Sequence, residues 1–238
     1  MTDKAKGVFT QVSLFSILLA GRYGGVCTLA EVKKHGSLAI ATMDRLDGEM
    51  QMIDGIVYQA RADGTIRLPA DNETIPFGTI AEFTPEQELL LDAIPTYEAF
   101  EERMKTLCPS LNLPLAIHLT GDFRRMKVRA VGRQETDGVG LAEAAKNEAL
   151  FDLPETSGDL VGFRLPGYVQ GINAPGWHLH FMDATRQHGG HVVNFTLQQG
   201  RLRTCRASDF RIMLPEVLDG LDLDRDWSKD LKKAEAER

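Results

Sequence analysis

Residues 176–192 read GWHLHFMDATRQHGGHV and hold four of the six histidines in the chain. Strand-forming residues begin this stretch, a polar segment with two consecutive glycines follows, and strand-forming residues then resume. This order is typical of a β-hairpin. We therefore expect two adjacent strands in this stretch.

The expected hairpin brings three histidines together. Because side chains alternate across a strand, His178 and His180 point to the same face. The return of the chain through the glycine pair places His191 beside them, whereas His188 lies on the flexible side of the turn and is expected to be exposed. Neutral imidazoles on a rigid strand suit a divalent metal such as zinc. A structural site would have four protein ligands, whereas a catalytic site keeps one position open.

Strand and turn patterns dominate the rest of the chain. The pattern predicts strands at 37–43, 49–54, 56–60, 79–83, 88–94, 160–165, 177–182, 191–197 and 201–205. It predicts helices at 12–21, 28–36, 97–108, 141–150 and in the charged tail from 225, a loop at 154–158, and a hairpin over 113–131 that turns at Thr120–Gly121–Asp122.

These elements predict an α+β fold with mixed β-sheets or a partly closed barrel, and with few short helices. We divide the chain into two similar tandem α/β subdomains, residues 1–150 and a β-rich half at 151–238 that carries the histidines. Residues 46–66 and 188–202 both run from turn to strand, turn and strand, so an internal duplication is one interpretation of the chain. That interpretation places Glu49 and His191 in equivalent local positions.

Composition and charge narrow the function classes. A net charge of −7 argues against a nucleic-acid partner, because phosphate binding needs a basic surface. The cysteines Cys27, Cys108 and Cys205 are isolated, so neither a disulfide framework nor a thiolate zinc site is expected. The apolar run at 12–21 is too short to span a bilayer. We therefore expect a cytoplasmic protein with no membrane anchor.

Among the charged residues, Glu49 is notable because it follows a tight turn and begins a strand. Asp47 is better explained as part of that turn. Arg129 shares strand parity with Lys127 and Arg125, so these three residues on their own are interpreted as a solvated basic stripe.

Over residues 10 to 235 the sequence resembles the alpha-acetolactate decarboxylase family. The matching stretches are HGSLAIATMDRLDGEM at 35–50, IPFGTIAEF at 75–83, KVRAVGRQ at 127–134, GFRLPGYVQGINAPGWHLHFMDATRQHGGHV at 162–192 and KDLKKAEAE at 229–237. The combination of GWHLHF, GGH and LDGE is far more specific than two histidines one residue apart. The chain departs from the family at 135–141, where a Pro-Tyr pair is usual, and this departure leaves the substrate scope open.

The resemblance implies a zinc site made by His178, His180 and His191, without His188. One Zn²⁺ per chain is expected, and another divalent metal would also suit the ligands.

The same resemblance implies that Thr42, Glu49 and Arg129, all from the N-terminal half, are catalytic residues. A second catalytic glutamate near the C-terminus corresponds to Glu235, with Glu237 as the alternative.

The implied reaction converts 2-acetolactate to acetoin and CO2. The substrate is a 2-hydroxy-2-methyl-3-oxo acid, so its own ketone accepts the electron pair and no organic cofactor is needed. A metal bound by the ketone and hydroxyl oxygens would stabilise a zinc-chelated enediolate as a Lewis acid. Arg129 would hold the carboxylate, Glu49 or Glu235 would supply a proton, and Thr42 would assist by hydrogen bonding.

The expected partner is therefore a small 2-hydroxy-3-oxo acid, in acetoin biosynthesis and the butanediol pathway. The resemblance alone implies a homodimer. Two alternatives stay open at this point: a cupin-like metal-dependent oxygenase, and a related domain with a structural metal and no decarboxylase activity.

Overall fold

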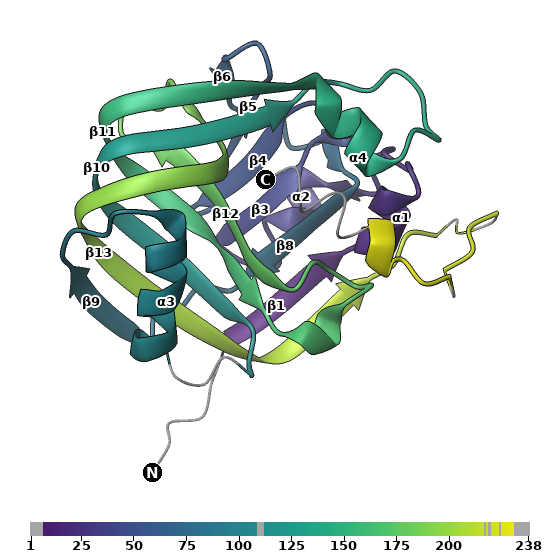
Figure 1. The fold of residues 1–238 in the computed structure, drawn as a ribbon. Coiled ribbons are helices and arrows are strands. Elements are labelled where there is room, and N and C mark those ends of the chain that lie inside the picture. Colours follow the sequence, from purple (N-terminus) through teal and green to yellow (C-terminus); the bar gives the residue numbers. More distant parts are fainter. Residues whose placement is uncertain (1–6, 109–111, 217, 219, 224, 231–238) are drawn as a thin grey trace.

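Strands predominate over helices in a computed structural model, which describes residues 7–108, 112–216, 218, 220–223 and 225–230 (Figure 1). The strands are β1 (Gly7–Val12), β2 (Cys27–Thr28), β3 (Leu38–Thr42), β4 (Glu49–Ile53), β5 (Ile56–Ala60), β6 (Ile66–Arg67), β7 (Thr74–Ile75), β8 (Phe77–Ala81), β9 (Gln87–Leu91), β10 (Leu115–Val131), β11 (Glu148–Leu165), β12 (Gly176–Asp183) and β13 (Gly189–Met213). The helices are α1 (Phe15–Leu19), α2 (Leu29–Val32), α3 (Tyr97–Leu107) and α4 (Leu141–Ala144), with 3-10 turns at Asp44–Leu46, Ala145–Asn147 and Gly167–Val169.

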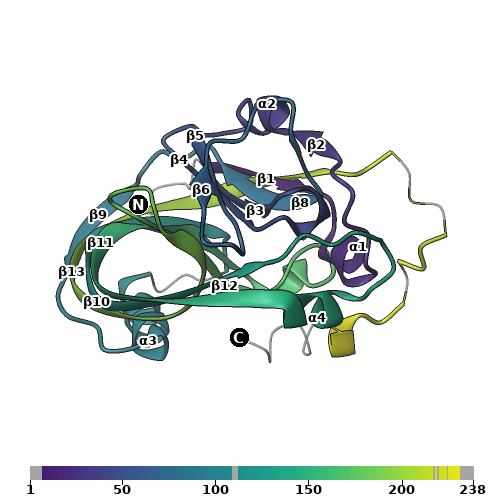
Figure 2. The ribbon, with the colours of Figure 1, turned by 90° about the horizontal axis from the view of Figure 1, so that it is seen from above.

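Strands β10, β11, β12 and β13 curl into a small barrel (Figure 2). Strand β10 pairs with both β11 and β13, and β12 pairs with β11 and β13, so the hydrogen bonding closes on itself. Apolar side chains fill the interior, among them Leu119, Phe123, Phe181 and Leu197. Helix α3 packs against the barrel, because Phe100 meets the ring of Trp177 edge-on.

The N-terminal half forms an open sheet in the order β1-β8-β3-β4-β5-β6. Strand β13 joins it to the barrel: residues 191–206 pair with β10, and residues 207–213 then run parallel to β1. One face of the sheet is covered by α2, and the other packs against the outside of the barrel, where Ile40 and Met182 share one apolar cluster. The space between the barrel and the sheet is where the candidate site lies.

The expected partly closed barrel with few short helices is confirmed. Two expected turns inside it are wrong, because β10 and β13 are continuous strands of 17 and 25 residues. Gly121, expected to turn a hairpin, instead lies opposite Gly158 and Gly200 on the two neighbouring strands. A Cβ added at Gly121 would lie 2.6 Å from the carbonyl oxygen of Gln199. The glycines therefore allow strands to approach closely while they curl, a common use of glycine within strands.

Other local expectations also differ from the structure. The loop expected at 154–158 lies within β11, and the helix expected at 141–150 ends at Ala144. Helix α1 is much shorter than the expected 12–21, and all five of its residues are buried. Strand β1 was not predicted. The boundary placed at residue 150 falls inside β11, and the division into two subdomains stays a prediction.

Candidate active site and metal centre

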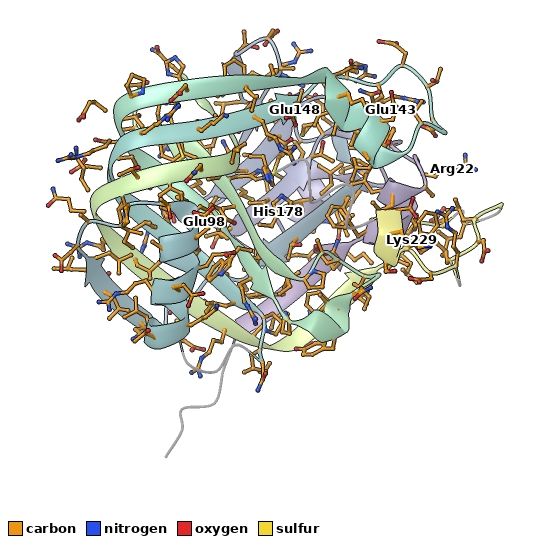
Figure 3. All side chains as sticks on the ribbon, in the orientation of Figure 1. Arg22, Glu98, Glu143, Glu148, His178 and Lys229 are labelled. Carbon is orange, nitrogen blue, oxygen red and sulfur yellow. The ribbon has the colours of Figure 1, made fainter. Side chains whose placement is uncertain are left out.

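Three histidines converge between the barrel and the sheet. His178 and His180 lie on β12, and His191 is the direct cross-strand partner of His180 on β13. One ligand atom from each residue lies within 4.8 Å of the others. Alternate residues of β12, such as Leu179, point into the barrel core, so the two histidines point out of it. The expected hairpin and its shared histidine face are confirmed, and Figure 3 shows His178 near the centre of the molecule.

The ring of His180 is held in one orientation. Its Nδ1–H donates to the carbonyl oxygen of Met50 at 3.0 Å, which leaves Nε2 as the unprotonated nitrogen. That Nε2 lies 3.2 Å from Nε2 of His178. Burial lowers the pKa of His180 to about 3, so the imidazole stays neutral and keeps its lone pair. A ligating histidine whose other nitrogen donates to a backbone carbonyl is the usual arrangement at protein metal sites.

These residues fit a zinc or similar divalent ion. The donor set is three imidazoles, and the orientation of His180 comes from the backbone rather than from the ion. Three protein ligands are the number that catalytic zinc sites use, since a further position stays open to substrate or water.

Glu49 faces the same cluster from the N-terminal sheet. It begins β4, is buried, and places Oε2 3.5 Å from Nε2 of His180. Burial raises the pKa of Glu49 to about 7, although the charge of Arg129 opposes this. Its partner on β3 is Thr42, whose hydroxyl donates to the carbonyl oxygen of Gly48 at 2.9 Å. Thr42 therefore stabilises the turn that leads into Glu49.

Arg129 reaches the site from the barrel. It is the cross-strand partner of His191 on β13, and it is buried, unlike the exposed Arg125. The interpretation of these residues as one solvated stripe is therefore wrong for Arg129. A register irregularity between Lys127 and Val128 separates the two arginines along β10. The Arg129 guanidinium donates through Nη1 to Oε2 of Glu148 at 2.6 Å.

A cavity of about 90 Å³ joins these groups. Its polar lining is Thr42, Glu49, Arg129, His178 and His191. Its apolar lining is Phe15, Leu18, Leu46, Phe77, Val131, Leu141 and Ala145. A space of this size, apolar on one side and charged on the other, suits a small organic acid rather than a macromolecule.

The remaining predicted positions lie elsewhere. His188 is in the turn before β13, with its side chain 54% exposed and its Nδ1 3.1 Å from Asp183. Glu235 and Glu237 lie outside the described residues, as does most of the expected terminal helix, of which residues 228–230 are helical.

The sequence did not reveal two parts of the site. Glu148, which pairs with Arg129, follows a segment without clear periodicity, and no spacing in the sequence marks it. The apolar wall comes partly from α1 and the turn before β4, far from the histidines in sequence. The segment 135–141, where the chain departs from the family, reaches the cavity through Leu141.

Comparisons with known proteins point to one family. The family model described as alpha-acetolactate decarboxylase matches residues 9–222. An alpha-acetolactate decarboxylase of Methanosarcina mazei is 37% identical, covering 99% of this chain and 82% of the relative. That of Bacillus subtilis is 36% identical, covering 98% and 92%. A crystal structure of the Bacillus subtilis enzyme superposes with a TM-score of 0.91 at 36% identity, covering 95% of this chain and 98% of that one.

Proposed function

Because the chain belongs to the alpha-acetolactate decarboxylase family, a group of carboxy-lyases, we propose that it uses one zinc ion per chain to convert 2-acetolactate to acetoin and CO2. The observation that carries the metal-dependent part is the convergence of His178, His180 and His191 beside a cavity that also contains a carboxyl and a guanidinium. Another divalent ion would fit the same ligands.

When bound, the ion would supply Lewis-acid stabilisation of the negative charge that develops on the substrate oxygens. The protein's part is to hold the three imidazoles in place. The His180 ring is fixed by the hydrogen bond to the Met50 carbonyl and by complete burial.

Arg129 is proposed to bind the substrate carboxylate. A buried guanidinium pairs with a carboxylate through strong charge-assisted hydrogen bonds. Glu148 holds the Arg129 guanidinium in the cavity wall. The proposed role of Arg129 is to orient the carboxylate that leaves as CO2. Tight binding of the carboxylate stabilises the ground state as well as the transition state, so it does not by itself accelerate the reaction. Arg129 therefore contributes to the rate by orienting the substrate.

Glu49 is proposed to donate the proton that takes the place of CO2 on the substrate carbon. Its carboxyl lines the cavity beside the histidines, within reach of a substrate held there. Thr42 stabilises the turn that positions Glu49. Glu235, with Glu237 as the alternative, is proposed as a second acid.

The finer properties are proposals as well. We propose a homodimer in the cytoplasm, acting on a small 2-hydroxy-3-oxo acid in acetoin biosynthesis. Among the described residues, no helix is long and apolar enough to cross a membrane.

The test is a CO2-release assay on racemic 2-acetolactate that follows acetoin at the same time. We expect equal amounts of the two products with or without oxygen, loss of activity with a chelator, and recovery on adding zinc. Oxygen consumption in place of anaerobic turnover would favour a metal-dependent oxygenase. Bound metal without any turnover would favour a structural site.

A further inference from the structure

The turn between β3 and β4 contains a backbone feature that the reaction as described does not use. Two consecutive residues other than glycine, Arg45 and Leu46, have positive φ angles of 61° and 54°. A bulky aliphatic residue is rare in this region, because its Cβ crowds the following carbonyl group. Such strain persists only where the surroundings enforce it, and it clusters at functional sites.

The surroundings do enforce this turn. The Arg45 amide donates to the Tyr23 carbonyl at 2.8 Å, and the Arg45 carbonyl accepts from the Gln134 amide at 2.7 Å. The Gly48 amide donates to the carbonyls of Leu46 at 2.7 Å and Val131 at 3.0 Å. The turn is therefore fixed to two other segments of the chain, at Tyr23 and at residues 131–134.

The strained backbone directs the Leu46 side chain into the cavity wall. Leu46 is 2% exposed and packs in the same apolar cluster as Phe15, Leu18, Phe77 and Val131. All five residues line the cavity that contains the histidines. Leu46 differs from the other four because its position depends on a left-handed backbone conformation.

We propose that Leu46 determines substrate specificity by limiting the size of the alkyl group on C2 of the 2-hydroxy-3-oxo acid, an inference that rests on the proposed function. C2 is tetrahedral and carries a carboxylate, a hydroxyl, an acyl group and an alkyl group. The polar side of the cavity accounts for the first three: Arg129 for the carboxylate, and the histidine site for the hydroxyl and ketone oxygens. The fourth substituent then faces the apolar wall, to which Leu46 contributes.

The test compares kcat/KM for 2-acetolactate with kcat/KM for its homologue bearing an ethyl group at C2. In Leu46→Gly the side chain is removed and the left-handed backbone is tolerated without strain. We expect the ethyl-to-methyl ratio to rise about 10-fold, the lower end of what one methylene is worth in a pocket. Inhibition constants of unreactive 2-alkyl-2-hydroxy acids should shift in the same direction.

Arg45→Gly is the matched control, since it relieves the same kind of strain one residue away without changing the cavity lining. We expect it to leave the ratio unchanged. Leu46→Ala keeps the backbone strain and shortens only the side chain, so it gives the same direction of change if the glycine variant does not fold. An unchanged ratio in both Leu46 variants, or an equal rise in Arg45→Gly, would overturn the inference alone. Failure of the unaltered chain to release CO2 from 2-acetolactate would overturn the proposed function, and the inference with it.

Discussion

The molecule buries histidines in two places, and their surroundings differ. Around His118, each ring nitrogen has a charged partner: Nε2–H donates to Asp159 at 2.8 Å, and Arg203 donates to Nδ1 at 2.7 Å. Asp159 also accepts from Thr120 at 2.9 Å and from Arg186 at 2.7 Å. In the candidate metal site, by contrast, ring nitrogens of His178, His180 and His191 lie close to one another, and Nε2 of His178 is 3.2 Å from Nε2 of His180.

This difference separates a structural role from a binding role. A buried polar network in which every group is paired stabilises one arrangement of the strands that carry it. Three imidazoles that converge beside a cavity form a donor set that could hold a divalent cation. His118, His180 and His191 are all buried, so burial does not distinguish the two clusters. The groups that each imidazole contacts do distinguish them.

The largest effect should come from breaking the converging cluster. In His180→Ala we expect zinc affinity and decarboxylation each to fall by more than about 100-fold, since loss of even an outer partner of a metal ligand costs 10–100-fold. Metal analysis of the purified variant and the CO2-release assay check this. Retention of one tightly bound zinc per chain would show that the ion binds elsewhere.

Breaking the paired cluster should affect stability instead. Asp159→Ala leaves the buried His118 and the partly exposed Arg186 without their shared partner, and we expect it to lower the free energy of unfolding by about 2–3 kcal/mol. The matched control is Asp152→Ala, in the exposed pair with Arg125, where the loss should be below about 1 kcal/mol. Denaturant unfolding measures both. Equal losses, or a loss of bound metal in Asp159→Ala, would contradict the distinction.

The paired cluster should also make stability depend on pH. Burial alone would raise the pKa of Asp159, but hydrogen bonds from His118 and Arg186 outweigh it and hold the pKa well below its usual range. A carboxyl whose pKa is lowered by folding stabilises the protein above its unfolded-state pKa, near 3.9, and this contribution is lost as the pH falls below that value. Unfolding measured between pH 6 and pH 3 should show a shallower acid loss in Asp159→Asn. An unchanged slope would mean that Asp159 contributes nothing to it.

The smallest effect is expected at His188, which is near the metal ligands in sequence but lies in an exposed turn. Its contact with Asp183 is partly solvated, so His188→Ala should change the free energy of unfolding by less than about 1 kcal/mol. Zinc content and activity should be unchanged. A loss of zinc in this variant would add His188 to the site and weaken the comparison.

Local patterns predicted the hairpin of the histidines, although the turn lies at residues 184–188 and the glycine pair belongs to β13, where it faces Phe181 and Met182 of β12. They failed at Gly121 and Gly200, where the same residue type allows close strand approach within a continuous barrel strand. Only the neighbouring strands decide between the two uses of glycine. The sequence shows no neighbours, so it could not separate a turn from a curl.

The site divides in a similar way. The three histidines could be found from their spacing, and the family resemblance added Thr42 and Arg129. Glu148 and Leu46 could not be found in this way, because each acquires its role from contacts formed by distant segments. The left-handed backbone of Leu46 is likewise enforced by other parts of the chain rather than by its own sequence preference.

The central claim is that one metal ion at the three histidines is required for decarboxylation. Titration of metal-free protein with zinc, followed by CO2 release from 2-acetolactate at each step, tests it most directly. We predict no activity at the start, a linear rise to one equivalent per chain and no further increase. Full activity of the metal-free protein, or a rise that does not follow the bound zinc, would contradict the claim.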